Sequence, residues 1–376
     1  MLGHEDLMDA AVAQTGLDDF GNDSFREGLE ILVQSLRAEA RLNSAGEAFV
    51  CERIARHLAQ RLQVEHWYRQ HPETDDVPIV SVLFGLGLPR TGSTALSFLL
   101  AQDPRVRYLR QWEASRPCPP PATVDGPDPR STPGGERTGI RGNHVPAGTN
   151  GNGPTECQDL MALDFKTHMF QAFAQIPTYS AWLLDADLTS TYLYERRVLK
   201  LLQWGQPPRP WRLKAPTHLL FLPYLDQAFP DARFVMTHRD PADVMVSVAE
   251  VYADIAGAYT DHLDPCYLGQ LNVEHWSVGM NRALKFRDGG AGHRFCDIGF
   301  IDMQADPVGE VCRLYRWLGE QTTDEFESAM RRWWTANQQD REPVTHPDPA
   351  TFGLDLAQVR PLFAEYITRS QEWITQ

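Results

Sequence analysis

Long apolar runs are absent from this chain of 376 residues. No run is long enough to span a bilayer, and the N-terminus MLGHEDLMDAAVAQ lacks the basic start and the apolar stretch of a signal peptide. These absences predict a cytoplasmic protein without stable membrane insertion.

Paired cysteines are missing as well. The chain has six cysteines, and they form neither a C-x-x-C pair nor a grouping with zinc-like spacing. We therefore expect unpaired thiols and no metal. The six are Cys51, Cys118, Cys157, Cys266, Cys296 and Cys312.

Basic residues are scarce relative to acidic ones. The chain has 35 Lys and Arg against 50 Asp and Glu, a formal net charge of -15, and no long basic run. Such a surface repels nucleic acid, which we exclude as a partner. An anionic ligand would need cations placed locally beside it.

The first part of the chain, residues 1–76, is predicted to be a helical segment that packs on the rest. Its apolar residues recur at helical spacing in two stripes. These are Phe25, Leu29, Leu32, Val33 and Leu36, followed by Val50, Ile54, Leu58 and Leu62. Residues 77–376 are expected to form one α/β domain.

Short apolar segments in that domain alternate with helical patterns. Residues 79–86, 211–214 and 233–238 have the composition of buried strands, and 294–300 are a further candidate. The alternation predicts a three-layer α/β fold with a central parallel sheet. Residues 117–154, rich in Pro and Gly, are expected to form a lid, a binding loop or a disordered insertion.

A glycine loop follows the first predicted strand. Gly87-x4-Gly92-Ser93-Thr94 departs from the nucleotide P-loop because Ser93 stands where that motif requires Lys. The loop amides, the following helix N-terminus and the Arg90 side chain still predict an anion cradle. We assign phosphate binding to Arg90, Thr91, Gly92, Ser93 and Thr94. A kinase or NTPase is an alternative, which the missing Lys disfavours.

A second motif follows the strand at 233–238. Arg239-Asp-Pro241 ends that strand, and Ser247 lies on the next predicted helix. With the glycine loop, it resembles the sulfotransferases that use 3'-phosphoadenosine 5'-phosphosulfate (PAPS), in particular the bacterial branch related to tyrosylprotein sulfotransferases.

The resemblance implies a role for each motif. The loop would bind the 5'-phosphosulfate of PAPS, and Arg239 and Ser247 would bind the 3'-phosphate. The implied reaction moves a sulfuryl group to a hydroxyl or amine of a small acceptor such as a lipid, sugar or phenol. It implies no metal and leaves the oligomeric state open.

Sulfuryl transfer calls for cations at the bridging oxygen and for a base on the acceptor. We expect Arg90 and Lys214 to supply the charge. Glu113 is the first candidate base, since related enzymes keep a Glu near this place, and Glu156 and His218 are the second and third. A non-catalytic nucleotide-binding protein is a further alternative that would not need these bases.

Overall fold

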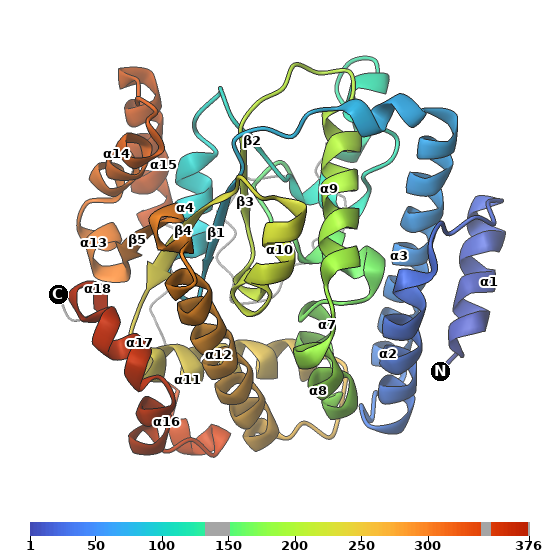
Figure 1. Ribbon diagram of the computed structural model, residues 1–376. Helices are drawn as coiled ribbons and strands as arrows, with labels where there is room; N and C mark the ends of the chain where they lie inside the picture. Colours follow the sequence, from blue (N-terminus) through green and yellow to red (C-terminus); the bar gives the residue numbers. More distant parts are fainter. Residues whose placement is uncertain (132–150, 340–346, 375–376) are drawn as a thin grey trace.

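The computed structural model describes residues 1–131, 151–339 and 347–374 (Figure 1). At its centre is a parallel sheet of five strands in the order β2-β3-β1-β4-β5. The strands are β1 (Leu83–Gly87), β2 (Arg107–Tyr108), β3 (Trp211–Lys214), β4 (Arg233–His238) and β5 (Phe295–Gly299). The predicted α/β fold with a central parallel sheet is therefore confirmed.

Three of the strands differ from the sequence prediction. β3 and β4 have the predicted bounds, but β1 begins at Leu83 because Ser81 has a left-handed φ of 49°, which interrupts an extended strand. β5 is one residue shorter at each end. β2 was not predicted, since two residues carry no alternation pattern.

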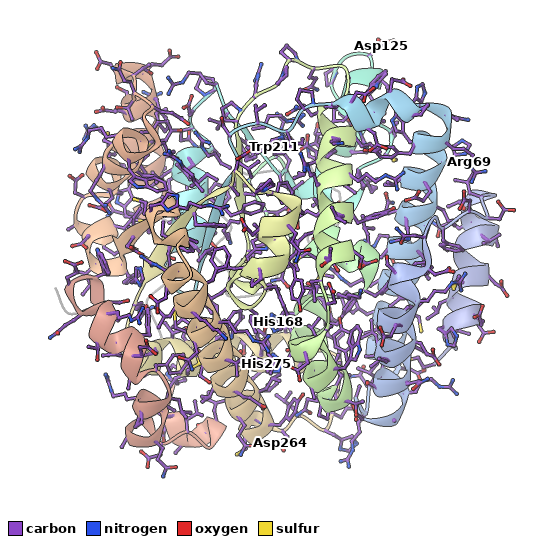
Figure 2. All side chains as sticks on the ribbon, viewed as in Figure 1. Arg69, Asp125, His168, Trp211, Asp264 and His275 are labelled. Carbon is purple, nitrogen blue, oxygen red and sulfur yellow. The ribbon has the colours of Figure 1, made fainter. Side chains whose placement is uncertain are left out.

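Side chains on the two faces of the sheet enter two separate hydrophobic clusters. Leu83 and Val235 point into one, and their neighbours Phe84 and Phe234 into the other, as the period of two in a strand requires. Figure 2 shows side chains filling the spaces between sheet and helices, with Trp211 labelled on β3. The sheet is thus the middle of three layers.

Helices cover both faces. Against the face of Leu83 pack α4 (Ser93–Leu100), α13 (Phe300–Ala305), α14 (Pro307–Leu318) and α15 (Asp324–Gln339). Against the face of Phe84 pack α9 (Thr189–Gln203), α10 (Leu222–Ala228), α11 (Pro241–Ala256) and α12 (Pro265–Asp288). α11 begins at Pro241, and the Asp240 side chain caps it by accepting a hydrogen bond from the amide of Ala242 at 2.8 Å.

The N-terminal helices lie together at one side of the molecule, opposite the C-terminal helices (Figure 1). They are α1 (His4–Thr15), α2 (Arg26–Ala38) and α3 (Ser44–Gln70). Both predicted apolar stripes are buried and share a cluster with the sheet residue Phe84. α1 lies within the predicted helical segment 1–76, and the division of the chain after residue 76 remains a prediction.

Residues 158–173 form three short pieces and not one continuous helix. These are α6 (Gln158–Met161), a 3₁₀ turn (Ala162–Asp164) and α7 (Met169–Phe173). Phe165 has a left-handed φ of 54°, and Tyr179 bridges the break by donating to the carbonyl of Phe165 and accepting from the amide of Thr167. A tertiary contact overrides the helical pattern here.

The remaining elements are short. They are α5 (Gln111–Ser115), α8 (Pro177–Asp185), α16 (Leu356–Leu362), α17 (Ala364–Arg369) and α18 (Gln371–Ile374), with 3₁₀ turns at Asp23–Phe25, Pro72–Asp76, Pro121–Thr123, Pro129–Ser131, Pro216–Leu220, Ala291–Arg294 and Pro349–Phe352. Of the expected Pro/Gly-rich loop, residues 132–150 lie outside the described residues.

The structure also bears on the cysteines and on the lack of long apolar runs noted in the sequence. None of the six cysteines forms a disulfide, as expected. In the described part of the chain, no helix combines the length and the apolar composition that crossing a membrane requires.

Candidate active site at the carboxyl ends of the strands

The glycine loop leaves β1 through backbone conformations that favour glycine. Gly87 has a φ of 136°, and a Cβ there would lie 2.5 Å from the carbonyl oxygen of Thr237 on β4. Gly92 has a φ of 85° at the start of α4, and Arg90 itself is left-handed with a φ of 64°. The sequence G-x4-G thus sets a tight turn against the neighbouring strand.

Thr91 fastens this loop to the sheet. Its buried hydroxyl lies 2.7 Å from the carbonyl oxygen of Leu88, to which it donates, and 2.6 Å from the hydroxyl of Thr237. Ser93 and Thr94 follow at the first turn of α4, where backbone amides have no acceptor within the helix. The loop therefore presents amides and hydroxyls from a rigid base, a geometry suited to an anion.

The two predicted phosphate motifs meet in space. Nε of Arg90 donates to the Ser247 hydroxyl at 3.2 Å, and Nη1 of Arg239 donates to the Arg90 carbonyl oxygen at 3.2 Å. Arg239 also stacks over the ring of Phe300, 4.6 Å from its centroid. Arg90 follows β1 and Arg239 follows β4, so residues far apart in sequence form one edge of a common site.

Two guanidinium groups lie at this edge, and the charge of Glu250 also acts on Arg90. Burial and then the nearby Arg239 charge lower the pKa of Arg90. Arg239 forms no salt bridge with any carboxylate in the described residues. Two guanidinium groups held near each other favour an anionic ligand between or beside them.

Lys214 and Glu156 form a second part of the site. Nζ of Lys214, at the end of β3, donates to Oε1 of Glu156 at 2.7 Å and to the Thr94 hydroxyl at 3.2 Å. The Lys214 side chain is 7% exposed and the Glu156 side chain 30%. Gln158 donates to the other Glu156 oxygen. The contact with Thr94 ties this ion pair to the glycine loop.

Glu113 lies elsewhere, at the first turn of α5. Its fully buried carboxylate accepts a hydrogen bond from Nη2 of Arg107 at 3.0 Å and one from the backbone amide of Arg110 at 3.0 Å. Burial lowers the pKa of Arg107. Among the described residues, no hydrogen bond or ion pair joins Glu113 to Lys214 or to the glycine loop, and its two oxygens form a helix cap and a buried ion pair.

His218 follows Lys214 closely in sequence, but its side chain lies in the core. It is fully buried in the 3₁₀ turn Pro216–Leu220, and its Nδ1 lies 3.0 Å from the hydroxyl of Tyr192. Burial lowers its pKa to about 3. A histidine in this setting stays neutral and does not reach the surface.

Three neighbours of the site were not singled out from the sequence. Thr237 anchors the loop, Phe300 supports Arg239, and Tyr252 on α11 lies near Glu156, whose charge adds to burial in raising the Tyr252 pKa. Phe300 directly follows β5 as Arg239 directly follows β4, and this shared position at strand ends is the signal that could have found it.

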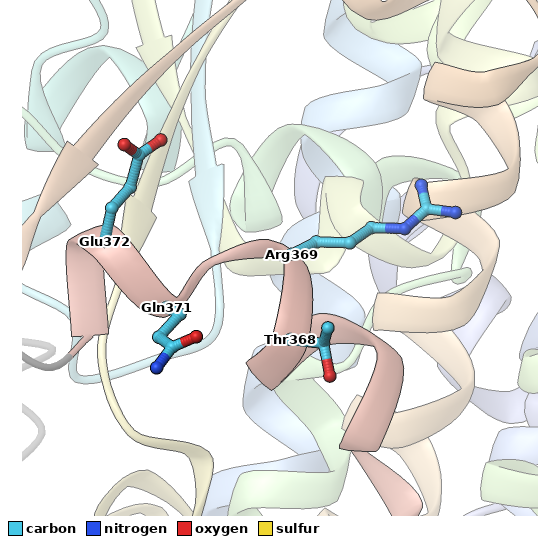
Figure 3. Close-up of a pocket in the computed structure, with 4 residues that line it drawn as sticks. All are labelled: Thr368, Arg369, Gln371 and Glu372. Carbon is cyan, nitrogen blue, oxygen red and sulfur yellow. The ribbon is translucent and has the colours of Figure 1, made fainter.

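A surface hollow at the C-terminus is separate from this set. It is lined by Thr368, Arg369, Gln371 and Glu372 on α17 and α18 (Figure 3). Arg369 there pairs with Asp288 and Glu365. None of the predicted site residues lines this hollow.

Comparisons with known proteins show which family the chain resembles. A family model described as "Sulfotransferase family" matches residues 83–324. The structure is similar to sulfotransferase STF9 from Mycobacterium avium, with 32% identity, a TM-score of 0.89 and coverage of 98% of this chain and 97% of that one. It is also similar to sulfotransferase STF1 from Mycobacterium tuberculosis H37Rv, with 29% identity, a TM-score of 0.82 and coverage of 96% and 98%.

A search of curated proteins gives no match. The suggested relation to tyrosylprotein sulfotransferases stays a prediction, while the kinase alternative is not favoured. Because the family model spans well over half of the sequence and begins at the first strand of the sheet, the chain belongs to the sulfotransferase family.

Proposed function

We propose that this sulfotransferase uses PAPS as its donor and transfers the sulfuryl group to a hydroxyl or amine of a small acceptor. The observation that carries the proposal is the contact between the two motifs, in which Arg90 donates to Ser247 and Arg239 donates to the Arg90 backbone. PAPS carries anionic groups at both its 5' and 3' positions, and it would need two such clusters side by side.

Each motif then has its own anion. Arg90 and the amides and hydroxyls from Thr91 to Thr94 would bind the 5'-phosphosulfate. Arg239 and Ser247 would bind the 3'-phosphate, since a doubly charged group calls for a cation and directed donors. In a protein with a net charge of -15, such placed cations are what holds an anionic nucleotide against the background field.

The transfer breaks the bond between sulfur and the bridging phosphate oxygen and forms one between sulfur and the acceptor atom. Charge develops on the bridging oxygen, which stays with the nucleotide, and Lys214 and Arg90 would neutralise it. The acceptor loses its proton to a base. The protein otherwise supplies alignment of the two reactants.

We favour Glu156 over Glu113 and His218 as that base. Glu156 is partly exposed and contacts Lys214. It would therefore lie beside the sulfuryl group that Lys214 is proposed to bind. The sulfuryl group, being anionic, would compete for the Lys214 ammonium, and a carboxylate released from an ion pair is a stronger base. Glu113 has both oxygens engaged, and His218 is sealed in the core.

A transfer assay tests the proposal. Purified protein is incubated with PAPS and a panel of phenols, sugars and lipids, and products are read by mass spectrometry. We expect a gain of one sulfuryl group on an acceptor and equimolar adenosine 3',5'-bisphosphate. Phosphorylated products from a parallel incubation with ATP and Mg²⁺ would instead support the kinase alternative.

A further inference from the structure

Three ligand-type side chains meet in the core beneath the site. They are Cys157, Glu195 on α9 and His218, and each is fully buried. One donor atom from each lies within 4.8 Å of the other two. A thiol, a carboxylate and an imidazole from three separate segments therefore face one small space.

These donors are poorly satisfied by the protein. Among the described residues, Nε2 of His218 has no hydrogen-bond partner, and the Glu195 carboxylate interacts only with the Cys157 thiol. The buried pair of His168 and His275 differs, because Nε2 of His168 lies 3.0 Å from Nδ1 of His275 and the two are hydrogen-bonded (Figure 2). A buried carboxylate without a strong partner is costly and calls for an explanation.

We propose that Cys157, Glu195 and His218 bind a divalent, thiophilic metal ion, for which Zn²⁺ is the best match. Sulfur, nitrogen and carboxylate oxygen are the ligands of protein zinc sites, and three of them leave one position for a further ligand. A thiolate and a carboxylate would neutralise the two charges of the ion, so the buried assembly would carry no net charge.

The surroundings fit this donor set. The Tyr192 hydroxyl lies 3.0 Å from Nδ1 of His218, and the tautomer in which Nδ1–H donates a hydrogen bond to this hydroxyl would leave Nε2 free to bind a metal. The thiol and the carboxylic acid would each lose a proton on binding the ion.

The ion would have a structural role next to the active site. Cys157 follows Glu156 directly, and its amide donates to the carbonyl oxygen of Lys214 at 3.0 Å. Joining Cys157 to α9 and to His218 would therefore hold the Glu156 segment against β3. The full burial of all three donors separates the ion from the substrates, so the inference does not depend on the proposed transfer reaction.

Metal analysis tests the site. Because the donors are fully buried, the ion would enter during folding, so the protein is produced in medium supplemented with Zn²⁺ and washed with a chelator before elemental analysis. We expect about one zinc per chain. Cys157→Ala and Glu195→Gln should lose most of it. Cys296→Ala, which removes a buried thiol outside the cluster, should retain it.

Production with Co²⁺ in place of Zn²⁺ gives a second readout, which can be recorded on the wild-type protein even where a variant does not fold. Thiolate-bound cobalt produces a near-ultraviolet charge-transfer band, which we expect in the wild-type protein and not in Cys157→Ser. Absence of both zinc and this band in the wild-type protein, or their retention in the Cys157 variants, would overturn the proposal.

Discussion

Glu113 and Glu156 lie on the same stretch of chain between β1 and β3, yet the structure gives them opposite surroundings. Glu113 is sealed between Arg107 and the start of α5, whereas Glu156 is partly exposed and reaches Lys214 at the end of β3. A base must meet its substrate's proton, while a cap must meet backbone amides. The comparison teaches that a carboxylate's partners, more than its place in a motif, indicate its role.

Among the variants that distinguish the two carboxylates, Glu156→Gln is expected to have the largest effect on kcat. Removing a general base should lower kcat by about 10²-fold or more with little change in donor affinity. Glu320→Gln is a matched control, because Glu320 is equally exposed and pairs with Arg212 on the same strand. Steady-state kinetics measure the difference, and an unchanged kcat in Glu156→Gln would remove Glu156 from the mechanism.

Lys214→Met should have the next largest effect. The variant keeps the side-chain stem but loses the charge that contacts Thr94 and Glu156. A charge-assisted contact contributes about 1.5–3 kcal/mol, so we expect donor binding to weaken by roughly one to two orders of magnitude. Calorimetric titration with PAPS and steady-state kinetics measure this, and unaltered affinity together with unaltered kcat would exclude Lys214 from donor binding and transfer.

Glu113→Gln is expected to act on stability. It leaves the buried Arg107 guanidinium without its counter-charge, which should cost about 3 kcal/mol of unfolding free energy and lower the Tm. The kcat of the folded variant should stay within a few-fold of wild type. Thermal unfolding and kinetics on one preparation decide it: a large fall in kcat at unchanged Tm would restore Glu113 as the base.

The smallest expected effect is that of Mg²⁺. Ser93 stands in place of the P-loop Lys, and the transfer as proposed engages only protein cations. Donor titrations with and without Mg²⁺ should therefore give the same affinity. A strong enhancement by Mg²⁺ would point back to the kinase alternative.

Much of the fold could be predicted because its signals are local. The buried strands at 211–214 and 233–238 and the Asp240 cap of α11 follow from short apolar runs and capping chemistry. The break at Phe165 and the strand β2 could not be predicted in this way. The break depends on the hydroxyl of Tyr179, and β2 depends on its pairing with β3.

The candidate site was predictable in part for the same reason. Arg90, Lys214 and Arg239 stand at strand ends, and parallel strands bring such positions to one edge of the sheet. The choice between Glu113 and Glu156 depends on side-chain partners, and the cluster of Cys157, Glu195 and His218 depends on three segments far apart in sequence. Neither is encoded by spacing.

The proposed donor site depends on Arg239 binding the 3'-phosphate of PAPS. Its most direct test is calorimetric titration of Arg239→Ala with PAPS and with adenosine 5'-phosphosulfate, which lacks that phosphate. Arg233→Ala is the control, because Arg233 carries the same charge at the opposite end of β4. We predict that PAPS affinity falls by roughly one to two orders of magnitude in Arg239→Ala alone, with adenosine 5'-phosphosulfate affinity unchanged. Equal weakening of both nucleotides would contradict the account.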